Sequence, residues 1–407
     1  MIRQREKSWP ALAGRVAYRP NCASLSHAVP MPPIVIDIRN AEDSRDVVHR
    51  AVQALAEGQL VALPTETVYG LAASACRPDA VARLLQVKGR PEGQPMALAI
   101  KSADEAPDFV PNMSPLARRL ARRCWPGPVT LVVENSHRDG LIAQLPKEVR
   151  QVIAPNGSVG LRVPANEMAQ AVLRMLSGPL VLTSANRSGQ PDATTAQEVV
   201  DYLDGDVALV LDDGPCRYGQ PSSVVRVTNN KYEVLREGVV GETTLKRLAG
   251  MMIVFVCTGN TCRSPMAELL MRATLAKQLG CTLDELEAHG VSVASAGIAA
   301  APGCPPASEA VLVMREQGLD LAPHEAQPLT DQLVRHADLI LAMTQSHMQS
   351  IIERWPSAAS RTRLVMPDRV DVQDPIGQSI GAYRHCAAQL TTAIKHHADQ
   401  LKSELNN

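Results

Sequence analysis

A cysteine and an arginine bracket a short polar loop in the second half of the chain. Cys257 and Arg263 enclose the residues Thr-Gly-Asn-Thr-Cys, after an apolar run and before Ser264, Pro265 and a helix expected from Met266. In such a strand–loop–helix, successive backbone N–H groups point at one anion. Arg263 can hold two phosphate oxygens, and the positive surroundings favour a Cys257 thiolate. The pattern predicts a phosphate loop with a nucleophilic thiol beneath the phosphorus atom.

The residues between and beside this pair are the candidate phosphate ligands. They are Thr258, Gly259, Asn260, Thr261, Cys262 and Ser264. Ser264 can also donate to the thiolate and stabilise it as a leaving group. An isolated Cys and Arg at this distance would indicate only a core cysteine at a strand end. The preceding strand, the Gly-Asn pair and the Ser-Pro helix start favour the phosphate loop instead.

The segment Val256–Glu268 resembles the signature of the low-molecular-weight protein-tyrosine phosphatase family, and the resemblance extends over about residues 251–400. It implies that Asp374, which precedes a proline, is the general acid. This residue would protonate the leaving group and then help water to attack a phosphocysteine intermediate. The resemblance also implies a reversible disulfide between Cys262 and Cys257 that protects the nucleophile.

Substrate preference in this family depends on positions at the rim of the loop. Thr261 stands where typical tyrosine phosphatases of the family carry a bulky aliphatic residue, and the loop is similar to that of bacterial protein-arginine phosphatases. The family's aromatic platform after Asp-Pro is absent, because Ile376 and Gly377 follow Pro375. A phosphotyrosine ring would have less to stack on. We predict phosphoarginine in proteins as the substrate, with phosphotyrosine as the alternative.

The first half contains short polar motifs but neither a Walker loop nor Gly-x-Gly-x-x-Gly. Lys88 and Arg90 form a Lys-x-Arg pair after a helical pattern. Residues two apart do not share a helix face, so the pair is expected to converge from extended backbone and to suit a triphosphate. Ser184 and Asn186 close a strand with a hydroxyl and an amide. Each motif alone would indicate an ordinary turn or cap, and Trp125 among prolines indicates a packing corner rather than a stacking site.

In this order the motifs resemble the YrdC-like family of threonylcarbamoyl-AMP synthases over about residues 40–240. The resemblance implies that L-threonine, bicarbonate and ATP react to give threonylcarbamoyl-AMP and pyrophosphate. Mg²⁺ would enter with ATP, and neither a tightly bound cofactor nor a metal held by the protein is expected. The residues carried over by position are, for threonine, Thr67, Arg162 and Ser222, and, for ATP, Lys88, Arg90, Ser158, Ser184, Asn186 and Arg236.

The resemblances also imply partners. A separate transferase would move the threonylcarbamoyl group to a tRNA adenosine, so contact with that enzyme would be indirect, and contact with tRNA or other RNA stays open. Phosphoproteins are expected at the second half. The alternative for the first half is a nucleotide- or RNA-binding module without synthase activity. The presence of both polar pairs, Lys88 with Arg90 and Ser184 with Asn186, favours the enzyme.

Two α/β units must position these residues, because strand and helix patterns alternate in both halves. We predict a disordered extension over residues 1–33, a YrdC-like twisted α/β domain over 34–248, and a small doubly wound parallel-sheet phosphatase domain over 251–407. Further expected elements are a helix around 44–56, a strand over 60–63, a helix over Met266–Gly280 and a closing helix around 381–405.

The composition sets outer limits. Of the 407 residues 45% are hydrophobic and 20% charged, with a net charge of −1, which argues against a general nucleic-acid coat protein. Nine scattered cysteines without a Cys-x-x-Cys pair predict reduced thiols in the cytoplasm and no structural zinc site. No apolar run approaches the about 20 residues that span a bilayer, so no membrane contact is expected.

Overall fold

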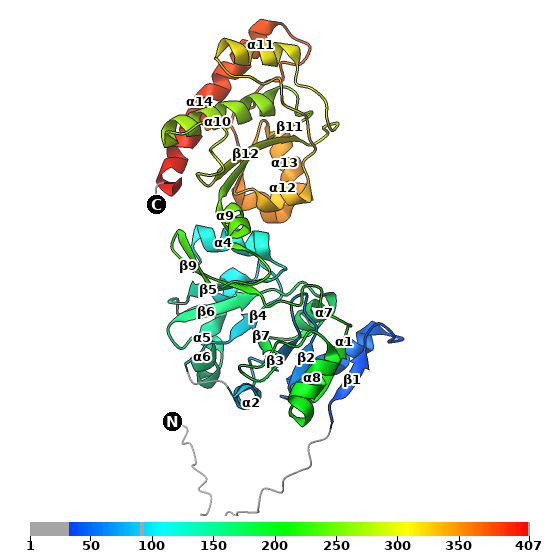
Figure 1. Ribbon diagram of the computed structural model, residues 1–407. Helices are drawn as coiled ribbons and strands as arrows, with labels where there is room; N and C mark the ends of the chain where they lie inside the picture. Colours follow the sequence, from blue (N-terminus) through cyan, green and yellow to red (C-terminus); the bar gives the residue numbers. More distant parts are fainter. Residues whose placement is uncertain (1–31, 90–92, 406–407) are drawn as a thin grey trace, which may run out of the picture. The chain divides into compact units, whose positions relative to one another are not determined.

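The computed structural model describes residues 32–89 and 93–405. Arg90 and nearly all of the expected extension over residues 1–33 therefore lie outside the described residues. The described chain forms two separate sheets (Figure 1). The first mixes parallel and antiparallel strand pairs, and the second is entirely parallel. The predicted α/β class, a twisted mixed domain followed by a small parallel-sheet domain, is confirmed.

The first sheet joins strands that are distant in sequence. In spatial order it contains β1 (Ile34–Asp37), β8 (Leu209–Asp212), β2 (Val61–Leu63), β3 (Gly70–Ser74), β7 (Leu180–Ser184), β4 (Ala97–Ala99), β6 (Ser158–Arg162), β5 (Val129–Glu134), β9 (Ser223–Thr228) and β10 (Lys231–Arg236). Strand β7 is antiparallel to both β3 and β4, whereas β4 is parallel to β6. This order brings β7 and β6, which carry the predicted site residues Ser184, Ser158 and Arg162, into the middle of one sheet.

Helices connect these strands. They are α1 (Ser44–Ala56), α2 (Pro78–Lys88), α3 (Ala106–Phe109), α4 (Pro115–Cys124), α5 (Leu141–Gln144), α6 (Lys147–Ile153), α7 (Glu167–Met175), α8 (Ala196–Leu203) and α9 (Glu242–Ala249). Local sequence explains several starts. The Asp43 carboxylate caps α1, and Thr195 and Glu198 form a reciprocal capping box at α8. Each cap satisfies N–H groups that have no partner within the helix.

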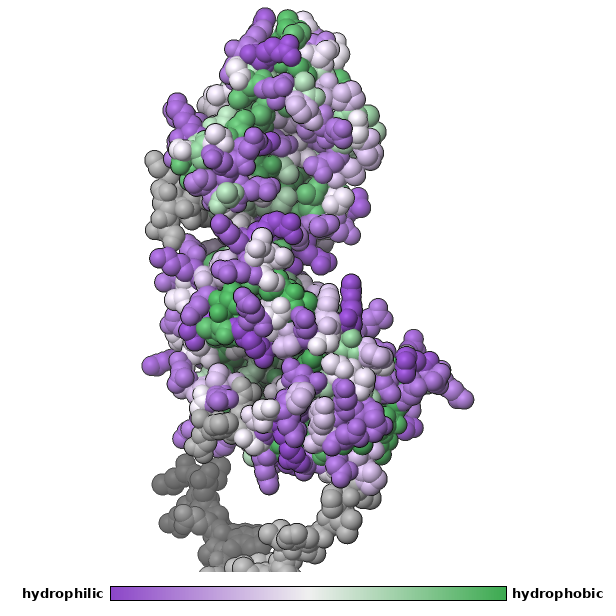
Figure 2. All heavy atoms as spheres, in the orientation of Figure 1, coloured by the Kyte–Doolittle hydropathy of each residue, from purple (hydrophilic) through white to green (hydrophobic). Residues whose placement is uncertain are grey.

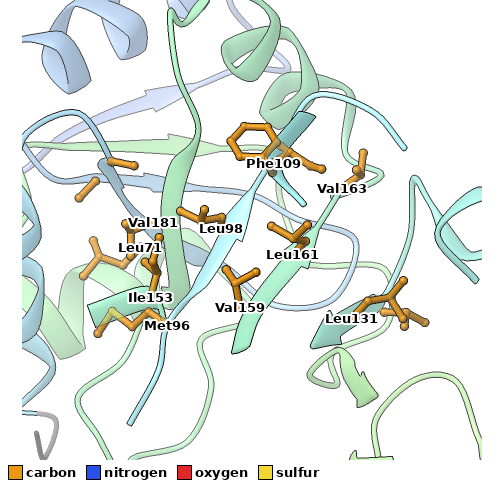
Figure 3. Close-up of a cluster of buried hydrophobic side chains, with 14 of the residues drawn as sticks. Leu71, Met96, Leu98, Phe109, Leu131, Ile153, Val159, Leu161, Val163 and Val181 are labelled. Carbon is orange, nitrogen blue, oxygen red and sulfur yellow. The ribbon is translucent and has the colours of Figure 1, made fainter. Parts of the chain in front are cut away.

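The first sheet is covered on both faces, as alternation along its strands shows. In β2, Ala62 packs into one hydrophobic cluster, and Val61 and Leu63 pack into another. Successive side chains of a strand point to opposite faces, so both clusters belong to one sheet. Figure 3 shows part of the larger cluster, with labelled side chains of β3, β4, β6 and β7 and Phe109 of α3.

The second sheet has the order β12 (Val291–Gly297), β11 (Met251–Cys257), β13 (Leu339–Ala342) and β14 (Thr362–Leu364). Its helices are α10 (Arg263–Leu279), α11 (Ser308–Glu316), α12 (Asp331–His336), α13 (Gln345–Arg354) and α14 (Ile380–Leu405). Helices α10 and α14 lie on one side of the sheet, and α12 and α13 lie on the other (Figure 1). Strand β11 packs Ile253 and Phe255 toward the first pair and Val254 and Val256 toward the second, as expected for a central parallel strand.

Helix α10 begins earlier than the sequence predicted. The expected start was Met266, but the first helical residue is Arg263, with Cys262 at the N-cap. Pro265 lies at the third helical position. A proline is nevertheless tolerated in the first helical turn, because the N–H group that it lacks would have no partner there. The phosphate loop therefore leads directly into a helix N-terminus.

The outer surface is mixed in polarity. Hydrophilic residues cover much of the face seen in Figure 2, with smaller hydrophobic areas between them. Across the described residues, no helix combines the length and the apolar composition that crossing a membrane requires.

Candidate active sites

The phosphate loop wraps its backbone around the Cys257 sulfur. Asn260 has a left-handed backbone with φ 58°, a conformation that asparagine tolerates, and its N–H donates to Cys257 Sγ at 3.2 Å. Ser264 Oγ lies 3.0 Å from the same sulfur. Cys257 is buried at the end of β11, next to the N-terminus of α10. Hydrogen-bond donors and a helix N-terminus are the surroundings that stabilise a thiolate.

The Asn260 side chain anchors this loop through hydrogen bonds to neighbouring segments. Its Nδ2 donates to Ser264 Oγ at 2.9 Å and to Ser295 Oγ at 2.8 Å. Ser295 in turn donates to Glu268 Oε2 at 2.7 Å, and Gln327 N donates to Asn260 Oδ1 at 2.8 Å. Roles for Ser295, Glu268 and Gln327 were not predicted from the sequence, because only the pairing of β12 with β11 brings Ser295 to the loop.

Arg263 and Asp374 meet although 111 residues separate them. Arg263 is buried, its Nη1 donates to the Val372 carbonyl at 3.1 Å, and its Nη2 is paired with the Asp374 carboxylate. The carboxylate stays partly exposed at the rim of the loop. The structure thus places the predicted acid beside the predicted phosphate-binding cation.

Further residues complete the rim of the loop. Cys262 Sγ lies 3.5 Å from Tyr383 Oη and 3.6 Å from Thr261 Oγ1, and burial raises the pKa of the Cys262 thiol. Cys257 and Cys262 are both free thiols here, so their disulfide stays a prediction. Ile376 is 63% exposed beside Asp374. Thr258 and Gly259 follow the cysteine, and Thr258 Oγ1 contacts a histidine of α13 that sequence analysis did not single out.

The first domain contains a polar cavity of about 630 Å³ on the sheet. Seven of the predicted site residues line it: Lys88, Ser158, Arg162, Ser184, Asn186, Ser222 and Arg236. Thr67 is buried next to Arg162, and Arg90 lies outside the described residues. Site residues predicted from separate motifs of the first half therefore line one cavity.

Arg162 is held at one end of this cavity with part of its guanidinium uncommitted. Its Nη2 donates to Glu66 Oε1 and to Thr67 Oγ1, both at 2.8 Å. Glu66 also accepts from Ala165 N at 2.7 Å. The Nε atom of Arg162 is buried and has no hydrogen-bond partner among the described residues. A buried guanidinium N–H without a protein acceptor fits an anionic ligand.

Lys88 is the last residue of α2, so the prediction that it lies on extended backbone is wrong. The chain turns immediately after it, because Gly89 adopts the left-handed conformation that ends many helices. Lys88 Nζ donates to the Ser184 carbonyl at 2.8 Å and to Asn186 Oδ1 at 2.6 Å, and Ser184 Oγ donates to the same amide oxygen at 2.6 Å. Lys88 of the Lys-x-Arg motif and both polar residues of the Ser-x-Asn motif are thus parts of one network.

Residues of β5, β9 and β10 also line the cavity. Thr130 Oγ1 lies 3.1 Å from Ser222 Oγ, and Arg236 Nη2 donates to the Ser222 carbonyl at 2.7 Å. Burial lowers the pKa of the Arg236 guanidinium. Thr130 was not among the predicted site residues, because its contact with Ser222 depends on the pairing of β5 with β9.

Trp125 is a packing residue, as its surroundings indicated. Its side chain is buried in the core of the first domain, and its Nε1 donates to the Val129 carbonyl at 2.7 Å. Within the described parts of the chain, no group of three or more His, Cys, Asp or Glu side chains is arranged to hold a metal ion.

The fold and both sites define the class of protein. The chain has two α/β domains. The first contains a cavity lined by cationic and hydroxyl side chains, and the second has the Cys–Arg loop of a cysteine-dependent phosphatase. Family models match both parts. The Sua5, YciO and YrdC family, described as telomere recombination, matches residues 53–238, and the low-molecular-weight phosphotyrosine protein phosphatase family matches residues 252–407. The first domain belongs to the Sua5, YciO and YrdC family, and the second domain matches the low-molecular-weight phosphotyrosine protein phosphatase family.

Individual proteins show the same division. A putative threonylcarbamoyl-AMP synthase of Mycobacterium tuberculosis is 36% identical over 51% of this chain and 91% of its own length. The threonylcarbamoyl-AMP synthase of Pyrococcus abyssi is 33% identical over 53% of this chain but only 61% of its own length. The chain thus spans about three-fifths of that relative. An arginine phosphatase structure from Geobacillus stearothermophilus is 37% identical and covers 38% of this chain and 94% of its own, with a TM-score of 0.34.

Proposed function

We propose that the first domain joins L-threonine, bicarbonate and ATP to form threonylcarbamoyl-AMP and pyrophosphate. The observation that carries this proposal is one cavity lined both by a buried Arg162 with an uncommitted Nε and by the Lys88–Ser184–Asn186 network. Arg162 would bind the threonine carboxylate, because a guanidinium matches that shape and charge. Thr67 and Ser222 would orient the amino acid, and Arg90, Ser158 and Arg236 would complete the ATP site.

The chemistry needs position and charge neutralisation rather than a protein nucleophile. The threonine nitrogen forms a bond to the bicarbonate carbon and loses a proton, a carbon–oxygen bond of bicarbonate breaks, and water leaves to give a carbamate. A carbamate oxygen attacks the α-phosphorus of ATP, the bond to the β-phosphate oxygen breaks, and pyrophosphate leaves. Mg²⁺ would arrive on the ATP phosphates and neutralise part of their charge. A separate transferase would pass the threonylcarbamoyl group to tRNA.

Pyrophosphate release tests this function. Release should depend on both threonine and bicarbonate, and Arg162→Ala should raise the KM for threonine at least about tenfold, since a charge-assisted contact is lost. Arg187→Ala is the matched control, because Arg187 pairs with Asp206 on the surface. ATP binding without threonine-dependent pyrophosphate release would instead identify a nucleotide-binding module.

For the second domain we propose hydrolysis of phosphoproteins through a phosphocysteine. The Cys257 thiolate attacks phosphorus, the bond to the leaving group breaks, and Asp374 gives that group a proton. Asp374 then takes a proton from water, the water oxygen attacks the phosphocysteine, and phosphate and the thiolate are released. The arrangement of Cys257 Sγ within reach of Asn260 N and Ser264 Oγ, with Arg263 paired to Asp374, supports this sequence.

We propose phosphoarginine as the substrate. Thr261 provides no bulky aliphatic wall on the loop, and the exposed Ile376 provides no aromatic platform on which a phenyl ring could stack. The test compares kcat/KM on phosphoarginine and phosphotyrosine peptides, with Cys257→Ser as the blank. A preference for phosphoarginine that Thr261→Ile reduces is the expected result. A preference for phosphotyrosine would assign the domain to the tyrosine phosphatases.

A further inference from the structure

A buried histidine of α13 connects that helix with the phosphate loop. His347 is 8% exposed, and both nitrogens of its ring face threonine hydroxyls. Its Nε2 lies 2.8 Å from Thr258 Oγ1, and its Nδ1 lies 2.9 Å from Thr344 Oγ1. Thr344 is the N-cap of α13 and also accepts the backbone N–H of His347 at 3.2 Å. The ring is therefore fixed at both ends.

The surroundings of His347 favour a neutral ring. Burial lowers its pKa and the Arg263 guanidinium acts in the same direction, whereas the carboxylates of Asp374 and Asp371 oppose them. Asp371 is itself engaged with the start of α13, where it accepts from Gln345 N at 2.8 Å. A neutral imidazole has one donor and one acceptor nitrogen, so it can join the two hydroxyls in one continuous hydrogen-bonded chain.

Thr258 is the point where this chain reaches the loop. It directly follows Cys257, and its carbonyl accepts from Ala299 N at 3.0 Å. Arg263 Nη2 lies 3.5 Å from Thr258 Oγ1 while the same guanidinium is paired with Asp374. A displacement of the Thr258 side chain would therefore change the position of the Arg263 guanidinium, which is the cation expected to hold phosphate.

We propose that His347 is a positioning residue of the phosphate loop: by holding the Thr258 side chain it keeps the loop and the Arg263 guanidinium in the geometry that binds a phosphoryl group. The proposal rests on the phosphatase function proposed above and adds a residue to that site. His347 touches no substrate atom in this account, and its effect passes entirely through Thr258.

Two readouts test it on the full chain. The first is the affinity for inorganic phosphate, measured as protection of Cys257 from iodoacetamide and followed by mass spectrometry of the Cys257 peptide. The second is kcat/KM on the phosphopeptides. His347→Leu should weaken phosphate binding about tenfold, as coupled neighbours in one network do. His347→Gln keeps a side-chain N–H for Thr258 and should recover most of the affinity.

A double variant separates positioning from general damage. If His347 acts through Thr258, His347→Leu should add almost no loss in a Thr258→Val background. A matched control is His397→Leu. His397 lies on α14 and is also buried, but its Nε2 bonds the Val365 carbonyl at 2.8 Å. This control should leave phosphate affinity unchanged. Urea midpoints establish that every variant is folded.

The outcomes are distinguishable. The proposal would be overturned if His347→Leu lowered phosphate affinity equally in the wild-type and Thr258→Val backgrounds, or if His397→Leu lowered it as much. Either result would leave the phosphatase function intact. If the wild-type chain binds phosphate with the expected dependence on His347 but hydrolyses neither peptide, the phosphatase function fails and the positioning role stands.

Discussion

At the scale of single residues, two buried histidines tie the stability of the second domain to pH. Burial lowers the pKa of His347 and of His397 from the ordinary value of 6.5. In the unfolded chain both take up a proton as the pH falls through about 6.5. The folded chain resists this uptake, so the unfolded state binds more protons between the two pKa values. Stability is thus fully present above about pH 6.5 and falls as the pH drops through that window.

We therefore expect the free energy of unfolding to be lower at about pH 5 than at about pH 7.5. His397→Gln should make the pH dependence shallower, because it removes one of the groups responsible. The measurement is urea unfolding at both pH values. His385→Gln is the control, since His385 is exposed on the same helix. An unchanged slope in His397→Gln would show that this histidine is not one of the responsible groups.

Residue types could be predicted from the sequence where one short motif carries the chemistry. Cys257 and Arg263 bracket one short loop, and their spacing indicated an anion site only together with the preceding strand, the Gly-Asn pair and the Ser-Pro start of the helix. Glu66 and Thr130 were not proposed, because nothing near them in sequence indicates Arg162 or Ser222. His347 was missed for the same reason: its partner Thr258 is 89 residues away, and only the packing of α13 beside β11 joins them.

At the scale of elements, the segment that follows β10 packs against the segment before β9, which lines the cavity. A Cβ atom on Gly238 would lie 2.3 Å from the Pro221 carbonyl oxygen and 2.6 Å from the backbone carbon of Ser222. Real Cβ atoms do not approach backbone this closely, so glycine lets the two segments touch. Ser222 lines the cavity, and its position depends on this contact.

Gly238→Ala should destabilise the chain by about 1–3 kcal/mol, as overpacking does, and should raise the KM for threonine by displacing Ser222. Gly241→Ala is the matched control, because a Cβ there meets nothing within 4 Å. Urea unfolding and pyrophosphate release measure the two effects. If the alanine at 238 is tolerated as well as that at 241, the close contact does not position the cavity wall.

Element boundaries followed from the sequence where a cap and an apolar stripe agree. The helix expected around residues 44–56 is α1 (Ser44–Ala56), whose start is capped by Asp43 and whose buried face includes Val47, Ala51 and Leu55. The start of α10 could not be predicted, because its first turn belongs to a loop whose shape is set by Asn260 and its distant partners. The end of α2 at Lys88 was misjudged for a similar reason, since the contacts that hold Lys88 come from β7.

At the scale of the whole molecule, one carboxylate joins residues of the two family segments. Asp338, which precedes β13, accepts from Arg122 at 2.5 Å and from Arg123 at 2.7 Å, and Arg119 Nε lies 2.9 Å away. All three arginines belong to α4. Burial alone would raise the pKa of Asp338, but the guanidiniums together lower it. The sequence offered no sign of this cluster, because it depends entirely on tertiary contacts.

Asp338→Asn should lower the free energy of unfolding by about 3 kcal/mol, because it leaves largely buried guanidiniums without their counter-charge. The matched control is Asp206→Asn, whose partner Arg187 is exposed, and the expected loss is below about 1 kcal/mol. Urea unfolding of the full chain measures both. Similar small losses in the two variants would mean that the cluster contributes little to stability.

The central claim is that two separate catalytic sites work on one chain. The most direct test measures threonine-dependent pyrophosphate release and phosphopeptide hydrolysis on the same preparations of the wild-type chain, Cys257→Ser and Arg162→Ala. We predict that Cys257→Ser abolishes only hydrolysis and that Arg162→Ala reduces only pyrophosphate release. The absence of either activity from the wild-type chain, or the loss of both in one folded variant, would contradict this account.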